Sequence, residues 1–286
     1  MGERKFRTTW VAAVVAGVMA LAATTGAVSI AGAGHGDVAR AAVSHQRTPS
    51  KIRSAAFTDS TDVARARSAA STRPAGSRPG GRAHRTPFLL VDVPSSMAVH
   101  AGPRAATSVI GQLPASSKYY HVNLTAWILK TAHHGAWGRV EIPYEWPRRD
   151  GWIPLHGLHR STTGVQVHVD LSKHWVSVKR FGRVLAGFRA ATGASYSPTP
   201  PGQYFVTDRI PFSAGGPLGS FAFGISGIQP HLPAGWSGGN QLAIHGTSDP
   251  SSIGRSASAG CVRVSEDSLH LLLPLLKLGT PVVIVP

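Results

Sequence analysis

Hydrophobic and polar residues alternate over short segments from about residue 87 onward. In the segment VQVHVD, residues 165–170, three valines alternate with three polar residues. A period of two is typical of a strand with one buried face. Similar segments follow at 175–178 and 184–191 after short turns. This pattern predicts a meander of antiparallel strands.

One short helix is expected near the C-terminus. Ser265 is a suitable N-cap, acidic residues follow it, and leucines recur on one face up to Leu273. Pro274 should end this helix, because proline has no backbone N–H to donate. The apolar residues 282–285 follow a turn at 279–281 and predict a closing buried strand.

The region 87–160 predicts a small SH3-like β-domain of short strands and tight turns. Strand-like segments lie at 125–130, 138–142 and 151–154. Four tryptophans accompany them: Trp127, Trp137, Trp146 and Trp152. We expect these rings in the core, and the alternative is an aromatic groove for sugar or peptide. With a second, sandwich- or barrel-like domain at 164–286, the sequence predicts a mainly β fold.

The N-terminal residues indicate export. Arg4, Lys5 and Arg7 precede an uncharged segment from Thr8 to Gly34 that contains a small-residue cleavage pattern. Residues 1–34 are therefore expected to be a signal peptide or a signal-anchor, which places the protein in the cell wall or outside the cell.

Residues 35–86 are poor in aromatics and lack periodicity, which predicts a disordered basic linker. Residues 1–86 carry 13 Lys and Arg against 4 Asp and Glu, in a chain of net charge +16. Such a tether could contact anionic wall polymers or a membrane surface, or only be solvated. We expect no nucleic-acid partner and a monomeric protein.

The chain has a single cysteine, Cys261, which follows Gly260 and lies sixteen positions after His245. One thiol cannot form an internal disulfide, so in an exported protein it bridges two molecules, packs inertly, or reacts. A lone cysteine is usually an inert core residue. The nearby glycine and histidine favour a reactive nucleophile.

His245 is the candidate base for this thiol, since it ends an apolar segment and should lie at the end of a strand. A carbonyl of Gly246 could hold the other ring nitrogen and fix the tautomer, as an acid does in a three-member triad. Asp249 is close enough in sequence to be considered for the same role.

Two further features favour acyl transfer. The N–H groups of Gly260 and Cys261 could point at one developing oxyanion. Arg263 lies two residues beyond the thiol and so on the same side of an extended segment. It could bind a substrate carboxylate or lower the pKa of the thiol.

The motifs IHGT at 244–247 and SAGCVR at 258–263 resemble the active-site signature of the L,D-transpeptidases, the YkuD-type catalytic domain family. The likeness runs from about Val165 to the end and includes the segment PPGQYF at 200–205. It implies Cys261 as nucleophile, His245 as base and Gly246 as the orienting carbonyl. It implies substrate-binding roles for four residues: Arg263, Ser258, Gly260 and Thr247. The family usually has histidine where this chain has Ala259.

The resemblance implies a peptidoglycan L,D-transpeptidase. Its thiolate would release D-Ala from one stem peptide, and an amine of a second stem would resolve the thioester as a 3→3 cross-link. The alternatives are an L,D-carboxypeptidase, which uses water, and a non-catalytic wall-binding protein. The Gly- and Pro-rich segment 221–240 would form a lid, or else a surface insertion. No cofactor or metal is expected, since the 14 histidines are scattered and no His-Glu-x-x-His segment occurs.

Overall fold

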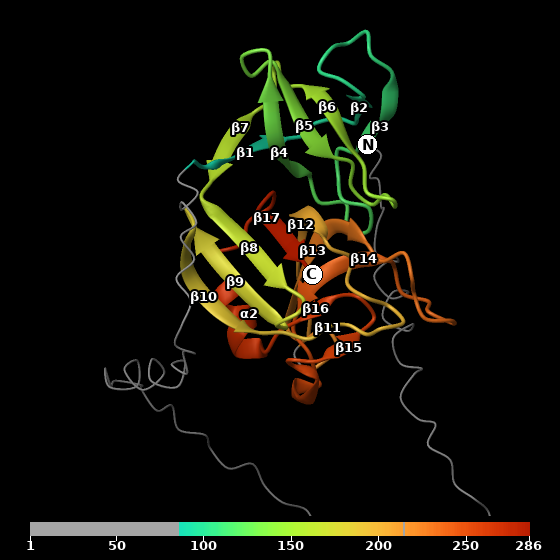
Figure 1. Cartoon of the computed structure of the whole chain (residues 1–286), viewed down its shortest axis with the longest axis vertical. Coiled ribbons are helices and arrows are strands. Elements are labelled where there is room, and N and C mark those ends of the chain that lie inside the picture. Colours follow the sequence, from blue (N-terminus) through green and yellow to red (C-terminus); the bar gives the residue numbers. More distant parts are fainter. Residues whose placement is uncertain (1–85, 214) are drawn as a thin grey trace, which may run out of the picture. The chain divides into compact units, whose positions relative to one another are not determined.

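The computed structural model of the chain describes residues 86–213 and 215–286 (Figure 1). The expected signal segment, and the expected disordered linker up to residue 85, lie outside these residues. Among the residues described, no helix is long and apolar enough to cross a membrane. The described chain consists mainly of strands, which confirms the expected mainly β fold.

The N-terminal sheet has seven strands in the order β3-β2-β6-β5-β4-β1-β7. Their bounds are β1 Phe88–Asp92, β2 Met97–His100, β3 Val109–Leu113, β4 Thr125–Ala132, β5 Trp137–Glu141, β6 Asp150–Pro154 and β7 Arg160–Thr163. β4, β5 and β6 confirm the three strand-like segments. β5 pairs antiparallel with both β4 and β6, as expected where short turns join successive strands.

The expectation for the tryptophans is correct for only one of them. Trp127 is buried in the core of the N-terminal sheet, whereas Trp146 is 49% exposed. Trp137 and Trp152 are half-buried. Trp146 lies in a turn between β5 and β6 rather than on the inward face of a strand, so the sheet gives it no core position.

The C-terminal sheet has eight strands in the order β10-β9-β8-β17-β12-β13-β14-β16, and β11 pairs with β15 in a separate small sheet. Their bounds are β8 Val165–Asp170, β9 Trp175–Arg180, β10 Arg183–Arg189, β11 Thr192–Gly193, β12 Gly202–Pro211, β13 Phe221–Ile228, β14 Gln241–His245, β15 Ser256–Ser258, β16 Val262–Arg263 and β17 Pro281–Val285. The antiparallel pairs β8–β9 and β9–β10 confirm the predicted meander. β17 confirms the closing strand, and it pairs parallel with β8.

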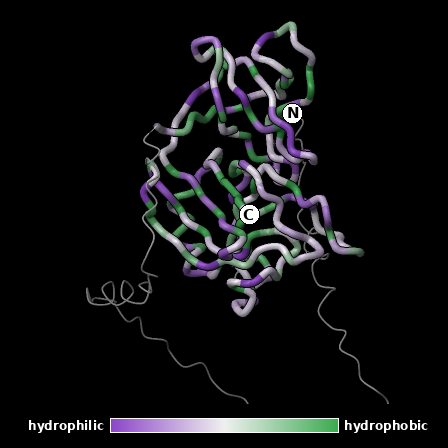
Figure 2. Tube along the Cα trace, viewed as in Figure 1, coloured by the Kyte–Doolittle hydropathy of each residue, from purple (hydrophilic) through white to green (hydrophobic). Residues whose placement is uncertain are grey.

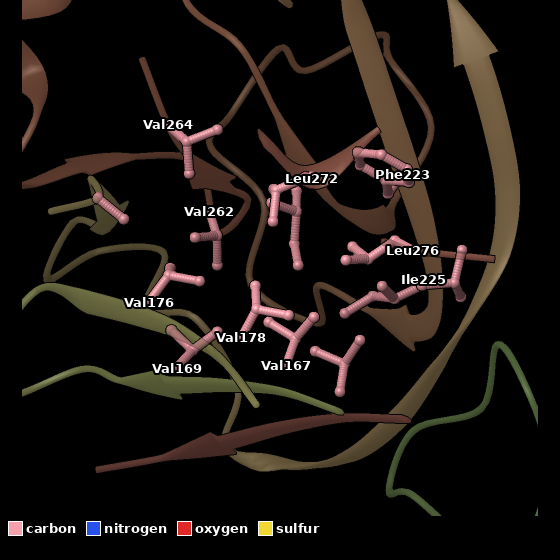
Figure 3. Close-up of a cluster of buried hydrophobic side chains, with 14 of the residues drawn as sticks. Val167, Val169, Val176, Val178, Phe223, Ile225, Val262, Val264, Leu272 and Leu276 are labelled. Atoms are coloured by element: carbon pink, nitrogen blue, oxygen red, sulfur yellow. The ribbon is translucent and has the colours of Figure 1, made fainter. Parts of the chain in front are cut away.

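Alternation along the strands builds the core of this sheet. Hydrophobic and hydrophilic residues interchange along the trace (Figure 2), and the three valines of β8 are buried while their polar neighbours are only partly so. Side chains from β8, β9, β13 and β16 meet residues of the C-terminal helical region in one cluster (Figure 3). The sheet is therefore buried on this face, and its other face is available to the site.

The predicted helix is present as α2, Glu266–Leu272. Ser265 caps it by accepting a hydrogen bond from the Ser268 N–H, and Leu269 and Leu272 are buried. The helix ends two residues before Pro274, as expected. A short 3-10 helix, η1, covers Pro250–Ser252.

The lid expected at 221–240 is wrong for its first part, because residues 221–228 form the buried strand β13. Its glycines resemble loop residues in the sequence but are required by packing. A Cβ on Gly224 would come within 2.6 Å of Gln241 Nε2, and one on Gly227 within 2.6 Å of Tyr204 Cε1. Only residues 229–240 form an irregular connection.

Side chains of the two sheets contact each other. Phe205 of β12 belongs to the core cluster of the N-terminal sheet. The Ser226 hydroxyl donates a hydrogen bond to the Glu141 carboxyl group, and the Tyr144 N–H donates to the Ser226 carbonyl over 2.7 Å. The Tyr119 hydroxyl donates to Asn240 Oδ1 over 2.8 Å. The residues just before β14 are thus tied to the N-terminal sheet.

Candidate active site

Strands β12, β13, β14 and β16 present one face to the hydrophobic core and the opposite face to the candidate site. Cross-strand partners share a face, and the register pairs Asp208 with Gly224, Gly224 with Ala243, and His245 with Arg263. The intervening residues, such as Phe223, Ile244 and Val262, point into the core. Small residues therefore cover the centre of the site face, and polar residues lie around them.

Cys261 lies directly before β16 and is half-buried. Its Sγ is 3.9 Å from the carbonyl oxygen of Gln241, at the start of β14. The backbone amide of Ala243 also acts on the thiol and lowers its pKa. The thiol thus lies beside β14 between Gln241 and Ala243, and His245 follows two residues further along the same strand.

The turn that carries the thiol is fixed by Ser258. Its Oγ accepts a hydrogen bond from the Gly260 N–H over 3.1 Å and donates to the Cys261 carbonyl over 2.6 Å. The Gly260 N–H has a single hydrogen, which is used here. Gly260 is therefore not free to donate to an oxyanion, contrary to the expectation from its position. Ser258 is buried and holds the turn rather than presenting its hydroxyl to a ligand.

Glycine is required at position 260 for two reasons. Its φ is +113°, a region that side chains rarely adopt, and an added Cβ would lie 2.1 Å from Gln229 Nε2. Its carbonyl accepts a hydrogen bond from the buried Thr199 hydroxyl over 2.8 Å. Thr199 Oγ1 in turn accepts from the Gly193 N–H over 2.8 Å, so the turn is anchored to β11.

His245 is buried, and its Nδ1 lies 2.6 Å from the carbonyl oxygen of Gly246. A carbonyl oxygen can only accept, so Nδ1 carries the hydrogen and Nε2 is left with its lone pair. Gly246 has no room for a side chain, because a Cβ would meet Glu266 Oε1 at 2.3 Å and Gly219 Cα at 2.8 Å. This close packing holds the carbonyl that orients the ring.

The electrostatics favour a neutral thiol and a neutral imidazole. Burial lowers the pKa of His245 to about 4, more than the hydrogen bond to Gly246 raises it, and the charge of Arg263 lowers it further. Burial also raises the pKa of the Cys261 thiol, and this effect exceeds the lowering by Ala243 and Arg263. Arg263 therefore does not produce a low thiol pKa, although its charge acts in that direction.

Arg263 has a hydrogen-bond donor that no described residue uses, whereas the Thr247 hydroxyl is already engaged. The Nε of Arg263 is buried without a hydrogen-bond partner among the residues the structure describes. Thr247 Oγ1 accepts from the Asp249 N–H over 3.0 Å and is engaged in a local turn. The Asp249 carboxylate accepts from the Ser251 N–H and hydroxyl, and is exposed. It does not hold the imidazole.

Three residues at the site had no signal in the sequence. Thr199, in the connection before β12, donates a hydrogen bond to the Gly260 carbonyl of the turn. Gln229, directly after β13, donates to the Pro198 carbonyl, and its amide packs closely against Gly260. Gln241 supplies the carbonyl beside the thiol. Each contributes through contacts with residues far away in the chain, which no local pattern indicates.

A thiol beside β14 and an oriented, unprotonated imidazole nitrogen at the end of that strand are the parts needed for covalent acyl transfer. Residues 164–284 match the model of the YkuD family, described as the L,D-transpeptidase catalytic domain. These residues form a YkuD-type L,D-transpeptidase catalytic domain. The match concerns these residues, and the activity of the whole chain is a proposal.

Two YkuD proteins and a solved L,D-transpeptidase are similar to this part of the chain. The YkuD protein of Bacillus licheniformis is 29% identical over 125 residues, which cover 44% of this chain and 68% of that protein. The YkuD protein of Bacillus subtilis is 27% identical over 123 residues, which cover 43% and 67%. A solved L,D-transpeptidase of Enterococcus faecium is 20% identical with a TM-score of 0.34, and the match covers 43% of this chain and 50% of that one. The match thus spans only about half the length of that structure.

Proposed function

We propose that the protein is a peptidoglycan L,D-transpeptidase that forms 3→3 cross-links through a thioester on Cys261. The observation that supports this most is the placement of the thiol beside β14, two residues from an imidazole whose Nδ1 is held by Gly246. The substrate would be a stem peptide with D-Ala at its fourth position.

In the acylation step, the Cys261 sulfur attacks the carbonyl carbon between the third residue and D-Ala. The thiol proton passes to His245 Nε2 and then to the departing amine of D-Ala, as the C–N bond breaks and the thioester forms. Since both groups are neutral at rest, proton transfer accompanies attack rather than preceding it. The lone pair on Nε2 is available throughout the neutral pH range, because the pKa of His245 is about 4.

In the second step, the side-chain amine of another stem attacks the thioester carbon. Its proton passes through His245 to the sulfur, the C–S bond breaks and an amide forms. We propose that Arg263 pairs with a substrate carboxylate, because its buried Nε has no partner among the described side chains.

Incubation with a disaccharide tetrapeptide, followed by mass spectrometry, tests the proposal. We expect release of D-Ala and a 3→3 dimer, both lost in Cys261→Ala and His245→Ala. A carbapenem should add covalently to the wild type only. Acylation of His245→Ala at the normal rate would show that the base is assigned wrongly.

The same experiment separates the alternatives. Release of D-Ala without a dimer, even with excess acceptor stem, would identify an L,D-carboxypeptidase. Wall binding without either reaction or adduct would identify a non-catalytic protein. Ala259 replaces the family histidine next to the thiol, and we expect Ala259→His to keep acylation, because the assigned base is His245.

We also propose that the protein is exported and acts as a monomer at the cell wall, with the basic N-terminal residues contacting anionic wall polymers or the membrane surface. Removal of residues 1–86 should leave activity on soluble fragments unchanged and weaken wall association. Equal association of both proteins at low salt would remove the electrostatic role from this segment.

A further inference from the structure

Gln241 is the one residue of β14 whose side chain is anchored while its main chain contacts the thiol. Its side-chain Nε2 donates to Asp208 Oδ2 over 2.7 Å, and also lies 2.9 Å from Thr207 Oγ1 and 3.2 Å from the Ile225 carbonyl oxygen. Its carbonyl oxygen is the group 3.9 Å from Cys261 Sγ. A single residue therefore connects the nucleophile to β12 and β13.

The anchor is strong because Asp208 is fully buried. Its Oδ2 accepts hydrogen bonds from Gln241 and, over 2.8 Å, from the Thr207 hydroxyl. None of the ion pairs formed by the described residues includes Asp208. A buried carboxyl group without a cation depends on its hydrogen bonds, so the loss of the Gln241 amide would be costly.

The fold makes space for this contact. Gly224 lies between the two residues in the sheet, and a Cβ there would come within 2.6 Å of Gln241 Nε2 and 2.7 Å of Asp208 Oδ2. Because Gly224 has no side chain, the Asp208 carboxyl group and the Gln241 amide can form a hydrogen bond across β13.

Two tyrosines of the N-terminal region lie near the anchor. Burial raises the pKa of Tyr144 and of Tyr120, and the nearby Asp208 charge raises both further. These two side chains thus lie near Asp208 from outside the catalytic domain. The burial of Asp208 lowers the local dielectric and so strengthens the hydrogen bonds that hold Gln241.

We propose that Gln241 is a positioning residue for the nucleophile, anchored by Asp208. The anchored amide fixes the start of β14, and the carbonyl there receives the thiol hydrogen and sets the side-chain conformation of Cys261. The inference rests on the proposed role of Cys261 as nucleophile. Gln241 itself would exchange no proton with the substrate.

The experiment compares wild type with Gln241→Met, which keeps the length of the side chain, and with Asp208→Asn, which keeps its shape. Gln166→Met on β8 is the matched control, since Gln166 is also a half-buried strand glutamine of the same sheet. For each protein, time-resolved mass spectrometry with a carbapenem gives the acylation rate at saturation and the apparent affinity. The rate of alkylation of Cys261 by iodoacetamide is measured from pH 6 to 10.

We expect the saturating acylation rate to fall about 10- to 100-fold in both variants, because small displacements of a reacting group have effects of this size. Apparent affinity should stay within about twofold. The double variant should be no slower than the slower single one, because Gln241→Met already removes the hydrogen bond that Asp208→Asn weakens by taking away the charge of the acceptor. The alkylation profile should shift along the pH axis in both variants and remain unchanged in Gln166→Met.

An unchanged saturating rate in folded Gln241→Met and Asp208→Asn, or additive effects in the double variant, would overturn the inference. If Gln241→Met does not fold, Asp208→Asn alone decides it. Failure of the wild type to be acylated would instead count against the proposed function. In that case the alkylation profiles still decide whether Gln241 positions the thiol.

Discussion

The hydroxyl of Thr199 donates a hydrogen bond of 2.8 Å to the carbonyl oxygen of Gly260, across 61 positions of sequence. The hydroxyl oxygen of Thr199 also accepts a hydrogen bond from the Gly193 N–H, so one buried side chain joins β11 to the turn that carries the thiol. The position of the Cys261 thiol therefore depends on a residue outside the proposed catalytic groups.

Replacement of Thr199 by valine should loosen this turn. Two buried backbone groups would lose their partner, and we expect the free energy of unfolding to fall by about 1–3 kcal/mol. Urea denaturation measures this change, and acylation by a carbapenem should slow as well. Thr199→Ser keeps the hydroxyl and should behave much like wild type. A valine variant with full stability and full rate would contradict the role of the hydrogen bond.

Gly260→Ala should destabilise the protein through both backbone and side-chain effects. The φ of +113° is unfavourable for alanine, and the new Cβ would clash with Gln229 Nε2. We expect a loss of about 2 kcal/mol or more in thermal denaturation. In Gln229→Ala/Gly260→Ala the clash is removed but the backbone strain stays, so stability should return only in part. Complete recovery would show that φ does not matter here.

The acylation rate should persist to a lower pH than an ordinary histidine base allows. His245 acts only as the neutral form, and burial lowers its pKa to about 4. Above that pH the base is available, and below it the base is lost. We expect the rate to stay nearly constant from pH 7 to about 5 and to fall below that. The acylation rate is measured at each pH from quenched time courses analysed by mass spectrometry. A midpoint of the pH dependence near 6.5 would contradict the effect of burial on the pKa of His245.

Glu141 should make stability depend on pH in the opposite sense from a carboxyl group whose pKa is lowered on folding. Burial raises its pKa from 4.5 to about 8. Between these values the folded chain keeps a proton that the unfolded chain releases, so stability falls as pH rises, by up to about 1.4 kcal/mol per pH unit. Glu141→Gln should remove this slope between pH 5 and 8 in urea denaturation. Equal slopes in both proteins would mean that Glu141 is ionised when folded.

Asp249→Ala should leave the acylation rate within about twofold of wild type. The Asp249 carboxylate is exposed and engaged with Ser251, while the imidazole is held by the Gly246 carbonyl. Intact-protein mass spectrometry with a carbapenem is sufficient to compare the two. A loss of tenfold or more would return Asp249 to the role of the third member of the triad.

Local patterns were enough to predict several elements of the fold. The alternation at 165–170 depends only on which side of β8 faces the core, and the cap at Ser265 depends on the hydrogen bonds of the first helical turn. Both signals are contained within a few neighbouring residues. The proposed pairing of His245 with Cys261 rests on the same kind of signal, since both residues lie in short motifs.

Features set by distant contacts could not be predicted. Strand β13 resembles a loop because Gly224 and Gly227 are selected by side chains from other strands. The thiol was expected to have a lowered pKa from Arg263, yet burial has the larger effect. Asp208 and Gln241 carry no motif, and their contact follows only from the register of three strands.

Strands β14 and β16 run in the same direction, so the chain must return from the end of one to the beginning of the other. On the way back it forms β15, and the pairing of β15 with β11 fixes the position of this part of the connection. We expect added residues to be tolerated in the exposed turn at 248–251, but not between Ser256 and Cys261, where β15 and the Ser258 hydrogen bonds fix the chain. The sequence distance between imidazole and thiol is thus a variable length followed by a fixed one, and searches for distant relatives should treat the two parts differently.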